Sequence, residues 1–503
     1  MRAVLKATGQ AGSSALVKLV AGVVSAKVVA LLLGPTGISD YTQFQYVLTI
    51  AALIGACGIN TSIVREVGRA EAADDRAELR RIYATGLLTT WLISTLTALA
   101  VWLLRGPIAA YALGDARLAP YLAWIALAIP LSSVTTIQVA LLNGLRLIGT
   151  MARVVILGAL AGLLATVGLV WAIGQPGLLI GLAAGPAVSA LVGQYYVRAA
   201  MAERDALAPL RALLGQIDPG IVRNLAALGS TVMVTALLAQ GTQFGARIWL
   251  LDRLGARANG EFQAAWMISI GYMSLVLYAM AADYYPRLVA AQGRPDELGL
   301  TINQQLKIAL LLIAPVAVAL MAFAPVAAQL LYSAEFTQTA TILRWQLMGD
   351  ILKAVSWAFG FVLLAAGRSA AYFLVELLWN VLFLAGIVYL TPRYGIAATG
   401  VSFLGSYIVY AAITWHLATR TAQYRVSRDV LQILLVVGAL MAAIWLVEWL
   451  TGAFVEYALL ALITAAAAAY SLVILEQQIG LLAALRARLR PERPATALPK
   501  DSA

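Results

Sequence analysis

Ten charged side chains interrupt otherwise apolar stretches of this sequence, and ionic chemistry could take place at them. Six are basic and four are acidic: Lys18, Lys27, Arg247, Asp283, Lys307, Arg344, Asp350, Lys353, Glu376 and Glu448. A charge at the centre of a membrane helix costs about 2.5–3.5 kcal/mol on insertion scales, so each one needs a reason to be there. The basic excess favours contact with an anionic ligand.

Lys18 and Lys27 lie in the first apolar stretch, nine residues apart. At about 100° per residue, two side chains with this spacing point to opposite sides of an ideal helix. Both could face one cavity only if the helix bends between them, and Gly22 is the candidate for such a bend. We expect at least one of the two lysines to contact an anionic group of the ligand.

Gln240, Gln243 and Arg247 form a polar stripe with i, i+3, i+7 spacing, which places them on one face of a helix. Such a face either lines a wet cavity or forms a hydrogen-bonded seam between helices. We expect Arg247 to bind phosphate, because a guanidinium offers two parallel N–H donors. Further polar candidates for substrate contact are Gln43, Gln45, Gln263 and Tyr272.

Four other charges are candidates for ion coupling or for a structural role: Asp283, Asp350, Lys353 and Glu376. Asp350 and Lys353 are three residues apart on one helix face and could neutralise each other. Asp283 and Glu376 lie near the ends of predicted helices, where water has access. Charges predicted to reach the headgroups from helix ends are Lys307, Arg344 and Glu448. The single histidine, His416, is predicted to be a structural or interfacial residue rather than a proton relay.

The composition identifies the elements that must position these side chains. Of the 503 residues 62% are hydrophobic and 12% charged, and the mean hydropathy is +0.86. Soluble domains are about 45–50% apolar and about 25% charged, so this is an integral membrane protein. The apolar runs are continuous rather than alternating, which excludes a barrel and predicts an all-α fold. The single cysteine, Cys57, excludes an internal disulfide.

Fourteen segments are long and apolar enough to cross a bilayer, which takes about 20 residues each. They cover residues 11–33, 41–64, 82–104, 118–142, 154–173, 178–198, 224–251, 261–284, 304–331, 341–366, 371–391, 399–418, 430–450 and 457–478. With both termini in the cytoplasm, most of the 35 Lys and Arg residues fall in cytoplasmic loops, as the positive-inside rule requires. The basic residues left in outside loops are Arg105, Arg117, Arg253, Arg257 and Arg393.

A repeat relates the two halves of the chain. At an offset of 218, Leu32-Leu33, Gly37 and Phe44-Gln45 align with Leu250-Leu251, Gly255 and Phe262-Gln263; at 221, Leu122 and Trp124 align with Leu343 and Trp345. Six helices separate the copies, so they enter the membrane in the same direction, as a parallel repeat. We expect an N-lobe over 1–198, a cytoplasmic linker over 199–223, a C-lobe over 224–418, two extra helices over 419–478 and a basic cytoplasmic tail over 479–503.

Three stretches resemble a known family. They are the run from Trp345 to Lys353, followed by Gly360, Gly367, Tyr372 and Glu376; the stretch from Lys18 to Gln45; and the stretch from Arg247 to Pro286, with Gly260, Gln263 and Tyr272. Together they resemble Wzx-type O-antigen and lipid III flippases, the polysaccharide transporter branch of the multidrug/oligosaccharidyl-lipid/polysaccharide exporter superfamily. The resemblance covers about residues 8–420, and the last two helices depart from twelve-helix members.

The resemblance implies a flippase that moves an undecaprenyl-diphosphate-linked oligosaccharide across the bacterial inner membrane by alternating access. The repeat unit would be an O-antigen, exopolysaccharide or common-antigen unit. Implied partners are this lipid-linked substrate, membrane lipids, and the polymerase and chain-length proteins of the same pathway; nucleic acid is not expected.

Two alternatives remain open on the sequence. A multidrug or cation antiporter would share the fold but favour an acidic cavity. An oligosaccharide polymerase would need an outside catalytic site, and the predicted outside loops are short. The sequence has no P-loop for ATP and no metal-ligand or nucleophile–base pattern, so we expect a transporter rather than an enzyme, with no cofactor.

Overall fold

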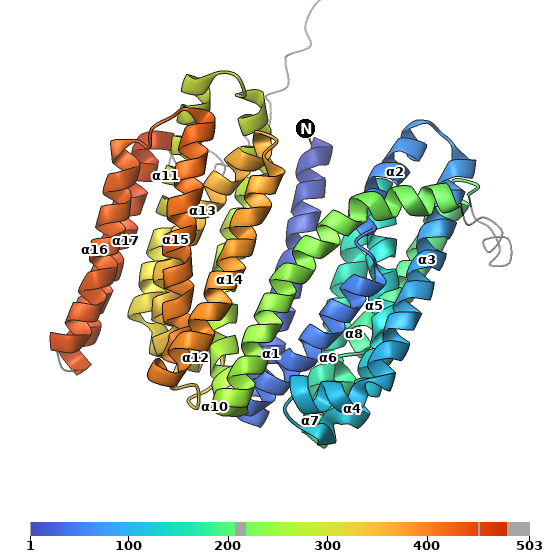
Figure 1. Ribbon diagram of the computed structural model, residues 1–503, viewed down its shortest axis with the longest axis horizontal. Helices are drawn as coiled ribbons and strands as arrows, with labels where there is room; N and C mark the ends of the chain where they lie inside the picture. The colour runs from blue at the N-terminus through green and yellow to red at the C-terminus, as the bar shows by residue number, and fades with distance from the viewer. Residues whose placement is uncertain (1, 207–217, 451–452, 480–503) are drawn as a thin grey trace, which may run out of the picture. The chain divides into compact units, whose positions relative to one another are not determined.

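Helices make up nearly all of the computed structural model, which describes residues 2–206, 218–450 and 453–479 (Figure 1). The first half contains α1 (Arg2–Gly55), α2 (Asn60–Ala72), α3 (Arg76–Leu103), α4 (Arg105–Pro107), α5 (Leu122–Gly144), α6 (Ile148–Ile173), α7 (Gln175–Gly181) and α8 (Ala184–Ala202). The second half contains α10 (Pro219–Ala290), α11 (Pro295–Ala322), α12 (Ala324–Leu331), α13 (Thr339–Ala365), α14 (Ser369–Tyr394), α15 (Ala397–Ala422), α16 (Arg428–Leu450) and α17 (Ala453–Ile479). The described residues include no strand, so the all-α prediction is confirmed.

Eleven helical stretches of the described chain are long and apolar enough to span a bilayer, which makes this a multi-pass membrane protein. One of them covers residues 14–55 of α1, while α10, at 72 residues, is longer than any single crossing requires. A straight helix of 72 residues would be about 108 Å long, against a bilayer core of about 30 Å. The predicted count of fourteen spans stays a prediction.

Two glycines break these long helices. Gly34 in α1 has φ 64° and Gly255 in α10 has φ 82°, in the left-handed region that favours glycine. Gly22, the candidate for a bend, is helical. The two breaks lie 221 residues apart, so the repeat follows the second of the predicted offsets. The offset of 218, which pairs Gly37 with Gly255, is therefore not the structural register.

Several predicted helices contain an unforeseen break. The stretch 41–64 is interrupted after Gly55, because Cys57 and Gly58 have positive φ values of 48° and 62°, and α2 starts afresh at Asn60. The stretch 304–331 is divided into α11 and α12 at Phe323. The predicted boundary between the segments 154–173 and 178–198 coincides with a break after Ile173, where Gly174 has φ 68°.

The chain divides into two compact units. Unit 1 comprises Met1–Gly271, Ala324–Gln346 and Ala370–Tyr410, and unit 2 comprises Tyr272–Phe323, Leu347–Ser369 and Ala411–Ala503. These boundaries cut α10 and α13, whereas the predicted lobes follow whole helices; the lobe boundaries stay a prediction. Of the predicted linker, residues 207–217 lie outside the described chain, as does the tail from residue 480.

In unit 1, α1 packs on α6, α3 on α5, and α8 on both α5 and α6. Its core holds branched apolar side chains with almost no exposed surface, among them Ile63, Val67, Ile82, Ile137, Leu141, Val154 and Val197. In unit 2, α16 and α17 pack against α11 and against each other (Figure 1). The two extra C-terminal helices are therefore integrated into unit 2.

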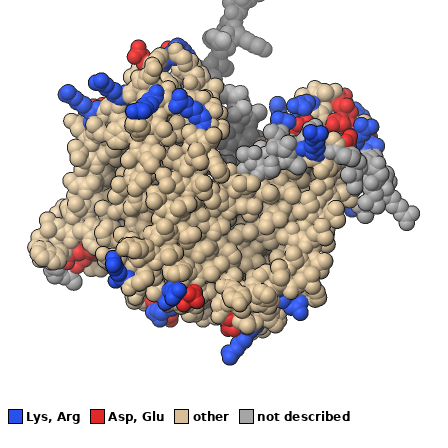
Figure 2. Space-filling view, viewed as in Figure 1, with Lys and Arg blue, Asp and Glu red and all other residues tan. Residues whose placement is uncertain are grey.

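The surface is that expected of a protein surrounded by lipid. Large apolar side chains stand exposed on the helices, for example Leu92, Trp171, Leu435 and Trp449. On the face drawn in Figure 2, the charged side chains gather at the ends of the helices, and other residues form the surface between them. Lipid tails are as apolar as these side chains, so exposing the side chains to a bilayer costs no free energy.

Candidate functional site

Arg247 on α10 is the largest fully buried side chain of the described chain. Its Nη1 donates to the backbone oxygen of Gln243 at 2.9 Å and to the Oε1 of the same residue at 3.0 Å. Its Nε donates to Gln263 Oε1 at 3.0 Å, and Nη2 donates to the same oxygen. Two neutral glutamines therefore hold the guanidinium in place.

Aromatic rings cover the rest of the Arg247 guanidinium. Its Cζ lies 4.6 Å from the ring centre of Tyr46 on α1, 4.9 Å from that of Phe262 and 5.8 Å from that of Trp266. Cation–π attraction at such distances stabilises a desolvated guanidinium. Among the described residues, no carboxylate forms an ion pair with Arg247. This buried cation is thus compensated by dipoles and ring faces alone.

The structure brings together only part of the predicted polar set. Gln243 and Gln263 are buried against Arg247, as described above, while Gln240 is half-buried and Gln45 is exposed. The three aromatic residues were missed by the sequence reasoning. Their only sequence signal was the repeated Phe-Gln pair, which places Phe262 directly before Gln263 and Phe44 two residues before Tyr46.

The two lysines of α1 have different surroundings. Lys18 is exposed, whereas Lys27 is half-buried and its Nζ donates to the backbone oxygens of Tyr332 at 2.6 Å and Gln329 at 3.0 Å. Both acceptors lie at the C-terminal end of α12. Burial raises the pKa of the Tyr332 phenol above its ordinary value, so that side chain stays neutral. In this structure the Lys27 ammonium is engaged by backbone carbonyls.

Tyrosine hydroxyls donate hydrogen bonds to two of the acids that the sequence places within apolar helices. In unit 2, Tyr272 donates to Asp350 Oδ2 at 3.0 Å, and Asp350 on α13 is fully buried, with Lys353 half-buried one turn later. In unit 1, Tyr410 of α15 donates to Glu376 Oε1 of α14 at 2.5 Å. A phenol can donate to a carboxylate without neutralising it, so each hydroxyl gives its acid a hydrogen-bond partner.

Two of the other charges lie in ion pairs. Asp283, whose side chain is 71% exposed, pairs with Arg287 one turn later at 2.8 Å. Lys307 pairs with Asp429. An exposed pair such as Asp283–Arg287 contributes little to stability. No group of three or more potential metal ligands occurs within the described ranges.

An aromatic cluster in unit 1 extends from the surroundings of Arg247 to Glu376. Its members are Phe262, Trp266, Trp379, Phe383, Phe403, Tyr407 and Tyr410. Neighbouring ring centres are 4.7 to 6.0 Å apart, within the range of favourable ring contacts. Such packing fixes the positions of the cation and of the acid at its two ends.

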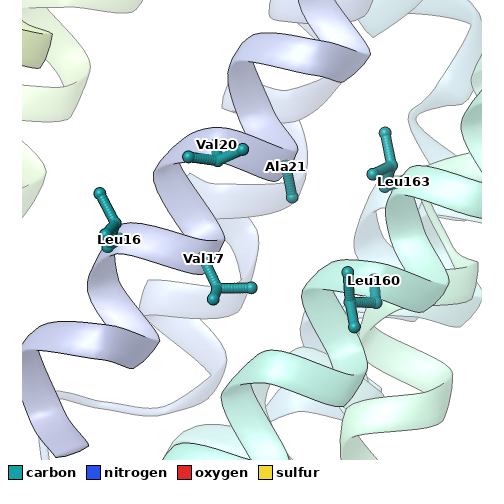
Figure 3. A pocket seen from close by; sticks show the side chains of 6 residues that line it. All are labelled: Leu16, Val17, Val20, Ala21, Leu160 and Leu163. Carbon is teal, nitrogen blue, oxygen red and sulfur yellow. The ribbon is translucent and has the colours of Figure 1, made fainter.

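A separate apolar cavity of about 220 Å³ lies between α1 and α6 (Figure 3). It is lined by Leu16, Val17, Val20, Ala21, Leu160 and Leu163. All six side chains are aliphatic, so the cavity suits a hydrocarbon chain and offers no group that could hold a phosphate or a sugar.

Comparisons with known proteins identify the family to which the chain belongs. Residues 4–292 match a family model described as polysaccharide biosynthesis protein. The chain is 25% identical over 408 residues to the lipid III flippase of Escherichia coli (strain K12), which covers 81% of this chain and 96% of that protein. The lipid III flippase of Shigella flexneri matches to the same extent.

Solved structures show the same fold at low identity. The lipid II flippase MurJ, in an inward closed conformation, has a TM-score of 0.74 and 12% identity, covering 93% of this chain and 99% of that one. A multidrug resistance MATE family transporter of the MOP superfamily, in an inward-facing conformation, has a TM-score of 0.68 and 14% identity, covering 81% and 94%. These matches confirm the resemblance found in the sequence. Since the family model covers more than half of its residues, the chain belongs to the family of polysaccharide biosynthesis proteins.

Proposed function

We propose that this protein is a flippase that moves an undecaprenyl-diphosphate-linked oligosaccharide from the cytoplasmic to the periplasmic leaflet of the bacterial inner membrane. The observation that carries the proposal is Arg247, a fully buried guanidinium held by two neutral glutamines in a membrane protein. A buried cation without a carboxylate partner attracts an anion strongly, because few dipoles compete for it there. The similarity to lipid III flippases supports a lipid-linked diphosphate as that anion.

The Arg247 donors can exchange their acceptor. Nε and Nη2 both point at one oxygen, Gln263 Oε1, and these two donors form the fork that binds a phosphate in bidentate fashion. A hydrogen bond to a charged partner is worth about 1.5–3 kcal/mol, against about 0.5–1.5 for a neutral one. A diphosphate would therefore displace Gln263, while Gln243 and the aromatic rings keep the guanidinium in position.

Transport would follow from alternating access between the N-lobe, 1–198, and the C-lobe, 224–418, with both termini in the cytoplasm. The kinks at Gly34 and Gly255, spaced as the repeat requires, support two equivalent lobes. Lys18 and Gln45 are exposed and Gln240 is half-buried, so we assign them to earlier or later substrate contacts. Outward movement of the negative diphosphate gains about 2.3 kcal/mol per charge per 100 mV.

The cation antiporter alternative shares the fold of the MATE transporters. An organic cation needs a buried acid among aromatic rings, and in the aromatic cluster of unit 1 the fully buried charge is instead Arg247, while Glu376 at the other end is half-buried. The geometry therefore supports an anionic substrate better than a cationic one.

The polymerase and chain-length proteins of a polysaccharide pathway are the partners that the proposed flippase function would require.

The test measures on which leaflet of the membrane the lipid-linked oligosaccharide lies. In a deletion strain, lipid-linked oligosaccharide should accumulate on the cytoplasmic leaflet, and the wild-type gene should clear it. Arg247→Lys keeps the charge and loses the fork, so we expect transport to fall at least tenfold at normal protein level. Arg253→Lys, on the same helix with a 58% exposed side chain, is the matched control and should transport normally. Equal transport by both variants would contradict a bidentate role.

A further inference from the structure

The chain between α12 and α13 is held from two directions. We call residues 329–339 the clasp: they include the end of α12 and the first residue of α13. Lys27 of α1 donates to Gln329 O and Tyr332 O of the clasp. All of these residues belong to unit 1.

The clasp is also fixed to α10. Glu261, only 2% exposed, accepts from the backbone nitrogens of Gln338 at 3.1 Å and Thr339 at 2.7 Å, and from Thr339 Oγ1 at 2.7 Å. Arg257 donates to Glu335 O at 2.9 Å. These contacts connect segments of the predicted C-lobe to one another, so they can persist when the lobes move apart.

Directly beside the clasp, α1 meets α10. Asn259 Nδ2 donates to Ser39 Oγ at 2.8 Å, and neither residue has exposed surface. A Cβ on Gly260 would lie 1.8 Å from Pro35 O, so only glycine allows this approach of the two backbones. The contact lies just after both kinks, Gly34 and Gly255.

Lys27 is the charged side chain of α1 that donates hydrogen bonds to the clasp. Its acceptors are backbone carbonyls at a helix C-terminus, where the last turn leaves oxygens without helical partners and the helix dipole is negative. A lysine is a compact cation on a flexible stem, so it can release such carbonyls and bind them again. A permanent contact would not need this reversibility.

We propose that Lys27 is a positioning residue that latches the junction of α1, α10 and the clasp in its closed state, and that release of this latch accompanies opening towards the periplasm. This inference rests on the proposed function, because alternating access requires a junction that opens and closes. With both termini in the cytoplasm, the kink of α1 and the clasp lie on the periplasmic side. The ligand of Lys27 in the closed state is the chain's own backbone.

The experiment measures closure directly. In a Cys57→Ser background, which removes the only native cysteine, Ser39→Cys and Asn259→Cys are combined and oxidised in membrane vesicles, so that a direct disulfide cross-links the pair only while the two buried side chains face each other. We expect efficient cross-linking of this parent. Lys27→Met should reduce the yield about tenfold, the factor expected when a charged group loses its hydrogen bonds. Lys27→Arg keeps the donors and should restore much of the yield.

Lys18→Met is the matched control, since it removes the same charge from the same helix at an exposed position, and its yield should equal that of the parent. If Lys27→Met accumulates poorly, Lys27→Gln takes its place and should also lower the yield. Equal yields in the parent and in the Lys27 variants, at equal protein level, would overturn the latch.

The readout needs no substrate. Loss of cross-linking without any flipping by the parent would therefore reject the proposed function and leave the latch standing. Cross-linked parent protein should be arrested in transport and recover on reduction; transport at full rate while cross-linked would overturn the claim that this junction opens.

Discussion

The closest backbone approach in the junction provides a quantitative test of the closed state. In Gly260→Ala the new Cβ would lie 1.8 Å from Pro35 O, 2.6 Å from Pro35 C and 3.0 Å from Pro35 Cα. All three are backbone atoms, so no side chain can rotate away and α1 itself must retreat from α10. Overpacking of this kind costs about 1–3 kcal/mol.

This cost falls on the closed junction alone, because the contact is absent once α1 and α10 separate. The open fraction should therefore rise about five- to 150-fold, at 1.4 kcal/mol per tenfold. The readout is the rate of maleimide labelling of Ser39→Cys in the Cys57→Ser background, since Ser39 has no exposed surface in the closed state. The Ser39→Cys parent already lacks the hydrogen bond to Asn259. Overpacking is therefore the only contribution to the free energy of the junction that Gly260→Ala adds.

Gly245→Ala is the matched control on the same helix. A Cβ there has no heavy atom within 4 Å, so labelling should not change. If Gly260→Ala labels at the parental rate while its protein level and thermal unfolding are unchanged, the close approach of α1 and α10 does not exist in the membrane. The reasoning about the junction would then be refuted.

Three further predictions concern the acids. Glu261→Ala leaves the donors at the start of α13 without their acceptor, so we expect a loss of about 3 kcal/mol or more in the free energy of unfolding. Glu261→Gln keeps an oxygen and should lose less. Equal losses in the two variants would contradict the role of Glu261 as the acceptor for the start of α13. Glu376→Gln should remove the response of flipping to an imposed proton gradient, because an amide takes up no proton, whereas Tyr410→Phe should retain it; a response that survives Glu376→Gln places any coupling elsewhere. Asp283→Asn breaks an exposed ion pair with Arg287 and should change the free energy of unfolding by less than about 1 kcal/mol, a bound that thermal unfolding can check.

Turns and helix breaks could be predicted in part, because glycine and proline mark them directly in the sequence. The turn at Gly174 and the all-helical fold follow from composition and turn residues. The break at Gly34 was harder, since Gly34 and Gly37 flank the same proline and a sequence match alone chose the wrong one. The 218 register aligned more residue types, but φ at Gly34 and Gly255 fixes 221.

The surroundings of the charged side chains could not be predicted in this way, since their partners are far along the chain or are not side chains. Tyr46 lies 201 residues before Arg247, and nothing local indicates that its ring covers a guanidinium. The partners of Lys27 are two backbone oxygens 302 and 305 residues away. Every residue offers such an oxygen, so no residue type marks the contact, and the sequence could only expect an anionic ligand.

The two cations of unit 1 differ in what could replace their present acceptors. Arg247 lies within an aromatic cluster that fixes its position, and its fork is engaged by one neutral amide oxygen, so under the proposed function a diphosphate would gain free energy by displacing that oxygen. Lys27 is engaged by carbonyls at a helix end, and an anion that took their place would separate α1 from the clasp. A diphosphate passing near Lys27 would therefore favour the open junction, as required if the substrate is to leave towards the periplasm. Lys27, which the sequence marks as a candidate substrate contact, would then also control the junction. The chain's own carbonyls and the substrate would compete for its ammonium group.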